Sequence, residues 1–202
     1  CQRIYRRRHP QGSRPALRGD PEVVEITAKA ARLFEELGCS VDQPAFGLDD
    51  PTTAFRTIFY TNNFASYGHL LEESPEDLTD NARVCLEQGS LTTGADFADA
   101  LRAVEVMRAR VDDLMENYDL LLSPTMAVPP FPIGQPPQRI GNKDVQASGS
   151  YSPLTRPFNM TGHPAASIPC GFSSEGLPIG LHIIGRLRDE ATVLRASAAF
   201  EQ

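Results

Sequence analysis

Residues 165–185 read AASIPCGFSSEGLPIGLHIIG, and this stretch decides the fold. Two apolar runs, 165–172 and 178–185, stand on either side of the polar linker 173–177. A short apolar run bounded by turn residues is typical of a strand buried inside a sheet. Gly176 in the linker suits a tight connection between the two runs. We therefore expect two buried strands joined by a short turn.

A third apolar run, DLLLSPT, occupies residues 119–125 and ends at a Ser-Pro pair. Its continuous apolar character predicts a strand buried on both faces, as in a parallel or mixed sheet with helices on each side. Residues 124–137 then contain six prolines, which cannot donate hydrogen bonds to a neighbouring strand. We expect a stiff, ordered loop there and a further loop over residues 139–151.

Helix signals surround these strands. Asp20 is a suitable N-cap, Pro21 occupies the first helical position, and Gly38 is a stop signal. CSVDQPAF (39–46) then predicts a short strand that ends at Pro44. Further helices are expected at residues 51–71, mostly buried, and at 75–89, 93–118 and 157–162. A last helix is expected after Asp189, with Ala191, Leu194, Ala198 and Phe200 facing inward. Together these elements predict an α/β fold.

Charge and composition limit the classes of function. The net charge of −7 and the pI of about 5.1 argue against nucleic acid as the main partner, because phosphate binding needs a basic face. Residues 1–20 contain six arginines and one acid, whereas the remaining 182 residues carry 13 basic and 25 acidic side chains. We interpret residues 1–19 as an irregular, solvated, Arg-rich head and residues 20–202 as belonging to a single domain.

The cysteine, histidine and apolar patterns predict neither a metal site nor a membrane segment. The four cysteines and four histidines show no metal-ligand or CxxC spacing. No stretch of about 18 apolar residues is present, so no spanning helix is predicted. These features favour a reduced, cytoplasmic protein without a cofactor.

Two segments carry residues that could do chemistry. In RPFNMTGH (156–163), polar side chains at the mouth of a sheet can line a ligand crevice, although capping and loop hydrogen bonds explain the same residues. In ASGSYS (147–152), Ser148 and Ser150 follow Lys143, and a serine nucleophile needs such a base. We interpret this second segment as a flexible polar loop rather than a catalytic site.

Two longer stretches resemble a known family. YDLLLSPTMAVPPFPIG (118–134) and the segment from RPFNMTGHPAASIP to GLPIGLHIIG and its following helix (156–201) are similar to the C-terminal half of the amidase signature family. The resemblance implies an α/β/α sandwich around a large mixed sheet. It also implies hydrolysis of a carboxylic amide by a Ser nucleophile, a second Ser in a cis peptide and a Lys base.

The chain lacks the part of the family pattern that carries the catalytic residues. The Gly/Ser-rich signature stretch and the Lys that precedes it are absent, so we assign no catalytic residue and expect the isolated chain to be inactive. By position, the resemblance implies that part of the substrate pocket comes from Thr125, Met126, Ser152, Arg156 and Asn159. The expected ligand is a small-molecule amide, and the family resemblance is compatible with a homodimer.

Three interpretations stay open. The first is part of a free-standing amidase. The second is a component similar to the A subunit of the glutamine-dependent tRNA amidotransferase. In that subunit an acidic residue and an Arg hold glutamine. Ser152 stands at the position expected for the acidic residue, which favours the first interpretation. The third is a non-catalytic scaffold or interaction module.

Overall fold

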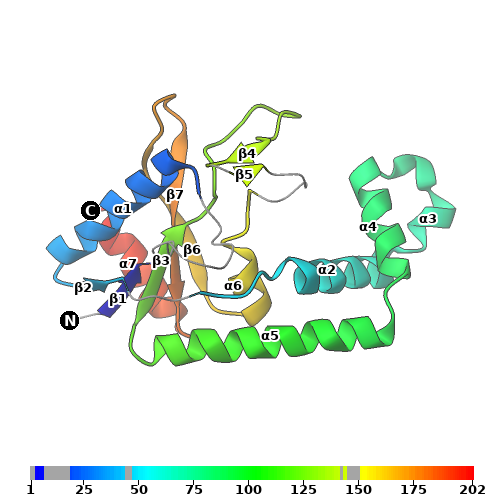
Figure 1. The fold of residues 1–202 in the computed structure, drawn as a ribbon, viewed down its shortest axis with the longest axis horizontal. Helices are drawn as coiled ribbons and strands as arrows, with labels where there is room; N and C mark the ends of the chain where they lie inside the picture. The colour runs from blue at the N-terminus through cyan, green and yellow to red at the C-terminus, as the bar shows by residue number, and fades with distance from the viewer. Residues whose placement is uncertain (1–2, 7–18, 44–46, 142, 145–150) are drawn as a thin grey trace. The chain divides into compact units, whose positions relative to one another are not determined.

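The computed structural model describes residues 3–6, 19–43, 47–141, 143–144 and 151–202 (Figure 1). The chain divides into two compact units, each described here by itself. One unit comprises Cys1–Leu48 and Arg110–Gln202, and the other comprises Asp49–Ala109.

A five-stranded mixed sheet forms the centre of the first unit. Its order is β2 (Ser40–Asp42), β1 (Arg3–Arg6), β3 (Leu120–Pro124), β7 (Pro178–Gly185) and β6 (Ala165–Phe172). Strand β1 runs parallel to both β2 and β3, whereas β7 is antiparallel to both β3 and β6. The predicted strands 165–172 and 178–185 are confirmed at both ends. Strand β3 is buried along its whole length, as its apolar run predicts.

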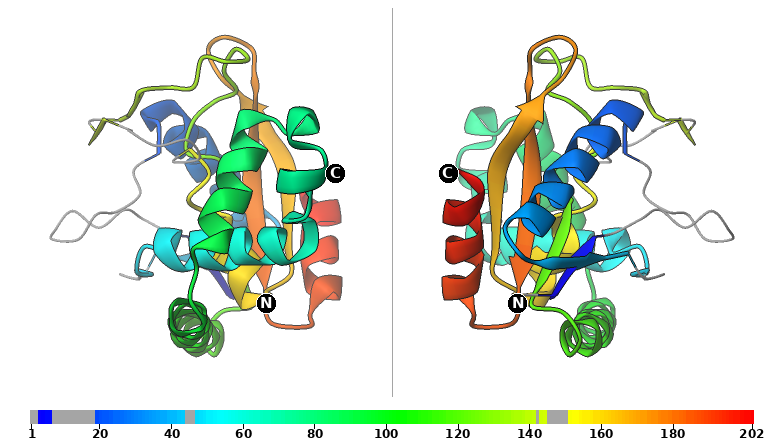
Figure 2. Two further views of the ribbon diagram at one scale, coloured as in Figure 1. Left: turned by 90° about the vertical axis from the view of Figure 1, so that its right-hand side faces the viewer. Right: turned by 90° about the vertical axis from the view of Figure 1, so that its left-hand side faces the viewer.

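Helices cover both faces of this sheet. In Figure 1, α1 (Pro21–Glu36) and α7 (Glu190–Phe200) lie on one side of the strands and α6 (Arg156–Thr161) on the other. The views of Figure 2 show the same elements from two further sides. The first face packs in a cluster formed by Ala30, Ala31, Phe34, Leu120, Leu122, Ile168, Leu181, Ile183, Val193 and Ala196. On the second face, Phe158 and the end of α5 (Gly94–Met115) pack against Leu121 and Ile184. The α/β/α layering is therefore confirmed.

Local signals fix the helix ends as predicted. The Asp20 carboxylate accepts a hydrogen bond from the Glu22 N–H at 2.9 Å and caps α1. Asp189 caps α7 by accepting from the Thr192 N–H at 3.2 Å. Helix α6 ends at Gly162, whose φ of 77° lies in the left-handed region that glycine adopts without strain.

The structure corrects four expectations for this unit. Residues 3–6 form a strand although the segment has no strand period, because backbone pairing with β2 and β3 decides its conformation. Strand β6 is largely exposed, because it lies at the end of the strand order. The inward face of α7 is Thr192, Val193 and Ala196, whereas Ala191, Leu194 and Ala198 are exposed. Of the predicted inward residues, Phe200 alone packs against the core cluster. A short hairpin, β4 (Arg139–Ile140) and β5 (Lys143–Asp144), lies where the sequence predicts a loop.

The second unit is helical. It contains α2 (Thr52–Tyr67), α3 (Leu70–Glu73), the 3-10 turn Pro75–Asp77, α4 (Asp80–Ser90) and most of α5. Helices α2 and α4 approach closely at Gly89, where an added Cβ would lie 2.7 Å from Phe64 Cβ. The expectation that the helix over residues 51–71 is mostly buried is wrong. Helix α2 packs along α4 on one flank and has no buried residue. The expected helix from residue 75 begins instead at Asp80, after its N-cap Thr79.

Candidate functional site

Strand register places a polar row across one face of the sheet. Ser123 of β3 pairs with His182 of β7, and His182 pairs with Ser167 of β6. Paired residues on adjacent strands share a face, so the three side chains point the same way. Ser123 Oγ lies 3.5 Å from His182 Nδ1. Ser123 and His182 are buried and Ser167 is exposed, so the row runs from the core to the surface.

A hydroxyl pair lies beside this row. The Thr125 N–H donates to the Gly180 carbonyl at 2.9 Å and extends the β3–β7 ladder by one residue. The Thr125 and Ser167 hydroxyls share a hydrogen bond of 2.7 Å. Their strands are separated by β7, a spacing of about 10 Å, so both side chains lean over Gly180. A Cβ at Gly180 would lie 2.8 Å from each hydroxyl oxygen. The pair therefore requires glycine at this position.

His182 is a neutral, packed histidine. Burial lowers its pKa from 6.5 to about 4, because the charged ring would lose its hydration. Its ring lies edge-on to Phe158, with centroids 5.6 Å apart. It therefore supplies no positive charge to this face at neutral pH.

A small apolar pocket lies where the loop after β3 meets α1 and the start of β7. Its volume is about 110 Å³, and it is lined by Val23, Met126, Val128, Pro129, Pro130, Phe131, Pro178, Ile179 and Gly180. Backbone hydrogen bonds hold its walls: the Asp20 N–H donates to the Ala127 carbonyl at 2.6 Å, and the Ala127 N–H donates to the Tyr151 carbonyl at 2.9 Å. Such a pocket suits a compact hydrocarbon group.

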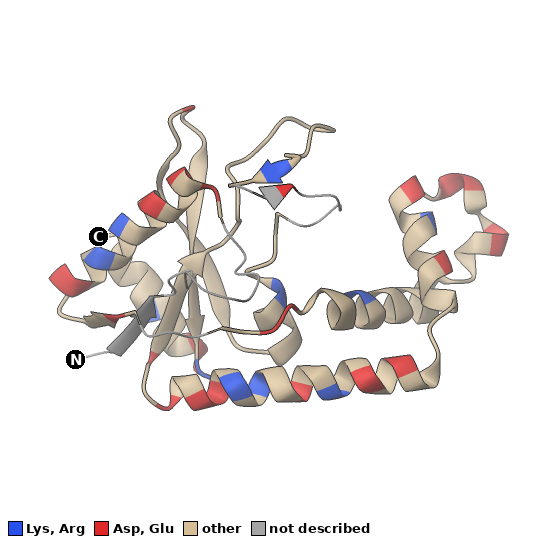
Figure 3. Ribbon diagram, viewed as in Figure 1, with Lys and Arg blue, Asp and Glu red and all other residues tan. Residues whose placement is uncertain are grey.

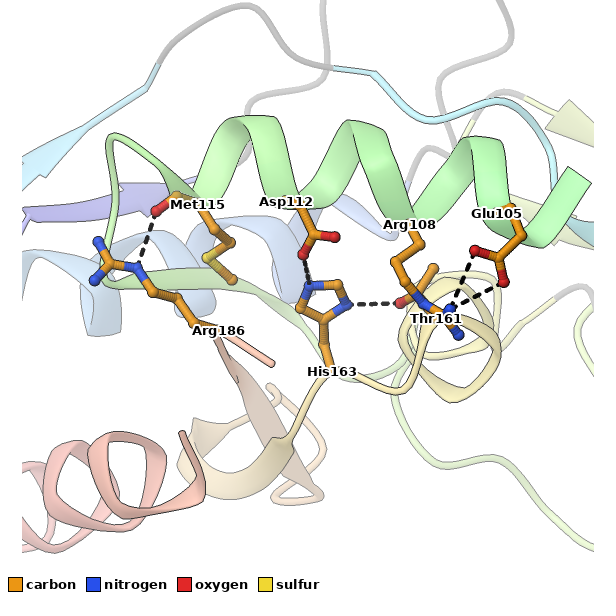
Figure 4. A network of polar contacts seen from close by, with 7 residues as sticks. All are labelled: Glu105, Arg108, Asp112, Met115, Thr161, His163 and Arg186. Atoms are coloured by element: carbon orange, nitrogen blue, oxygen red, sulfur yellow. Dashed lines mark hydrogen bonds and ion pairs between the residues drawn. The ribbon is translucent and has the colours of Figure 1, made fainter. Parts of the chain in front are cut away.

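A second hydroxyl–imidazole arrangement lies in the core (Figure 4). His163 Nδ1 is 2.8 Å from Thr161 Oγ1, and His163 Nε2 is 3.2 Å from Asp112 Oδ1. The order of groups is that of a serine-hydrolase triad. However, Thr161 and the His163 side chain are 0% exposed, so no substrate reaches the hydroxyl. The arrangement instead connects α5 to the segment between α6 and β6.

The five predicted pocket residues are placed as follows. Thr125 belongs to the hydroxyl pair, and Met126 lines the apolar pocket. Ser152 follows Tyr151, so the Ala127–Tyr151 hydrogen bond brings the two predicted segments side by side. Arg156 is half-buried at the start of α6, and Asn159 is exposed on the same helix. The structure thus brings Thr125, Met126 and the Ser152 backbone into one region, with Arg156 and Asn159 on α6.

Three residues of this region, Ser167, Gly180 and His182, are not identified by sequence reasoning. Each lies within an apolar run that indicates only a strand. Strand register alone brings them together with Thr125, and one sequence does not disclose register.

Other chemistry is limited in the described part of the chain. No group of three His, Cys, Asp or Glu residues there could hold a metal ion. Among the described helices, none is both long and apolar enough to cross a membrane. Burial raises the pKa of the Cys170 thiol to about 11, so it stays protonated and unreactive at neutral pH. Helix α5 carries both basic and acidic residues along its length (Figure 3). Ser148 and Ser150 lie outside the described residues.

Comparisons with known proteins identify relatives. A family model described as amidase matches residues 13–194. An acylamidase of Rhodococcus erythropolis is 33% identical over 187 residues, which cover 90% of this chain and 39% of that protein. The A subunit of the glutamyl-tRNA(Gln) amidotransferase of Moorella thermoacetica is 34% identical over 212 residues, covering 91% of this chain and 41% of that protein.

A solved structure of the same family has a similar fold. The crystal structure of a bacterial aryl acylamidase of the amidase signature family superposes with a TM-score of 0.83 and 25% identity. The match covers 99% of this chain and 43% of that one. The chain thus spans about two fifths of the length of the curated relatives described here.

Proposed function

Because the chain belongs to the amidase signature family, we propose that it is part of a hydrolase that cleaves a carboxylic amide to an acid and ammonia or an amine. The family match over residues 13–194 carries this proposal. The mixed sheet covered by helices on both faces supports it, since the chain superposes on an aryl acylamidase structure over 99% of its length.

We propose that the Ser–(cis)Ser–Lys triad lies outside this chain. Supporting this, Lys29 forms an ion pair of 2.7 Å with Glu25 on the exposed side of α1. Ser123 and Thr161 are buried. The Lys29 amine is therefore engaged by Glu25 and makes no contact with either buried hydroxyl. The family's bridging serine relays a proton from nucleophile to lysine, a role that needs all three groups in contact.

The substrate we propose is a small amide whose hydrocarbon part enters the apolar pocket, as part of a free-standing cytoplasmic amidase. Ser152, in the position expected for the glutamine-binding acid, supports this choice over a component of a tRNA amidotransferase. Similar identities to relatives of both kinds keep the amidotransferase component as the second candidate. Thr125, Met126, Ser152, Arg156 and Asn159 are the proposed pocket residues, and a homodimer without nucleic-acid or membrane partners is the proposed state.

Intact mass spectrometry after treatment with a serine-directed fluorophosphonate tests the location of the triad. We expect no adduct on the folded 202-residue chain, and a stoichiometric adduct would overturn the proposal. A longer protein that contains the chain and the signature stretch should take up one probe and release ammonia from benzamide. Failure of that protein to hydrolyse any of a panel of amides would refute the amidase assignment.

A further inference from the structure

We propose that the Thr125–Ser167 hydroxyl pair hydrogen-bonds the amide group of the substrate and so selects amides over esters. This inference rests on the proposed amidase function and deepens it. The pair is a specificity-determining feature, and its hydroxyls take no part in bond cleavage.

The hydrogen-bonding capacity of the pair matches a carboxamide. Each hydroxyl offers one donor and two acceptor lone pairs. Their mutual 2.7 Å bond uses one donor and one lone pair, which leaves one O–H donor beside several lone pairs. A carboxamide presents a carbonyl acceptor beside an N–H donor. The two groups are therefore complementary, whereas an ester lacks the N–H.

The hydroxyl pair is accessible, unlike the two hydroxyl–imidazole contacts described above. Ser167 is exposed on the edge strand β6, and Thr125 is half-buried. The adjacent Ser123–His182 contact and the Thr161–His163 contact are both buried. Of these three polar contacts, the Thr125–Ser167 pair is the one that a solute can reach.

The sheet also holds the backbone of both residues in place before any ligand binds. Thr125 is held by its N–H bond to the Gly180 carbonyl, and Ser167 lies within the β6–β7 ladder. Gly180 supplies the space that both hydroxyls occupy. Groups held on strands lose little freedom on binding, which favours recognition. The neighbouring His182 is neutral, and an uncharged surrounding suits a neutral amide.

The test is a titration of the 202-residue chain with benzamide, followed through the backbone amide resonances of Thr125, Ser167 and Gly180. Methyl benzoate is the matched ligand without an N–H. We expect benzamide to shift these resonances at millimolar concentrations and methyl benzoate to shift them less. T125V and S167A should each weaken benzamide binding about five- to ten-fold, the value of one hydrogen bond.

The controls separate recognition from structure. S90A removes an exposed hydroxyl that bonds the Glu87 carbonyl and should leave binding unchanged. Thermal unfolding of each variant confirms that it is folded. Equal shifts with both ligands, no shift at the three resonances, or unchanged affinity in T125V and S167A would each overturn the inference. Ammonia release by the longer protein reports separately on the amidase function, so the two failures are distinguishable.

Discussion

Gly180 is the residue on which the proposed site depends. It belongs to the lining of the apolar pocket, and it leaves the space in which the Thr125 and Ser167 hydroxyls meet. Any larger residue places a Cβ 2.8 Å from both oxygens, which is shorter than a normal contact.

Substituting Gly180 with alanine should therefore cost stability as well as binding. We expect G180A to lower the free energy of unfolding by about 0.5–1.5 kcal/mol, because the new methyl group must turn the Thr125 and Ser167 hydroxyls out of their hydrogen bond. Urea denaturation measures this change. Gly94 has nothing within 4 Å of an added Cβ, so G94A is the matched control and should stay near the unsubstituted value. Equal effects of the two substitutions would contradict the proposed crowding.

His182 should make stability depend on pH. Its folded pKa of about 4 lies below its ordinary value of 6.5, so between these values the unfolded chain binds more protons. Stability should fall as pH decreases from 6.5 towards 4, by at most about 1.4 kcal/mol per pH unit from this residue. Denaturation at several pH values should show a shallower fall in H182Q, with His69 replaced in the control H69Q. Identical slopes in H182Q and the unsubstituted chain would refute this role.

At the scale of elements, the sequence predicts best where local signals and burial agree. Strand β6 follows Pro164, β7 begins at Pro178 and ends at Gly185, and both strands end where predicted. The N-caps Asp20 and Asp189 likewise mark α1 and α7. Strand β1 has no such local signal, since its conformation depends on two distant partners. The sequence likewise does not predict the Thr125–Ser167 hydroxyl pair, because the pair depends on the register of three strands.

The Thr161–His163–Asp112 arrangement should act as a structural connection between elements. We expect T161V to destabilise the fold by about 1–3 kcal/mol, because it leaves the buried His163 Nδ1 without its hydroxyl partner. T61V is the control, since Thr61 makes a local bond of 2.7 Å to the Thr57 carbonyl within α2. The measurement is urea denaturation of both variants. A T161V variant as stable as T61V would show that the connection contributes nothing.

At the scale of the whole molecule, burial differs sharply between the central strands of the first unit and helix α2 of the second. Strand β3 is buried throughout and most of β7 is buried, whereas α2 has no buried residue and Leu91, after α4, is 72% exposed. A segment with few buried apolar contacts opens at a lower free energy than a core strand. Helices α2 and α3, neither of which has a buried residue, should therefore open without unfolding the sheet.

Native-state hydrogen exchange tests this difference directly. We expect the amides of β3 and β7 to exchange slowest, through global unfolding alone, because both strands pair on two sides. The amides of α2 and α3 should exchange orders of magnitude faster, through local opening of their own unit. Their exchange should also respond weakly to low urea, since a small opening exposes little surface. Uniform protection of α2 and β7 would instead show that the two units unfold as one cooperative body.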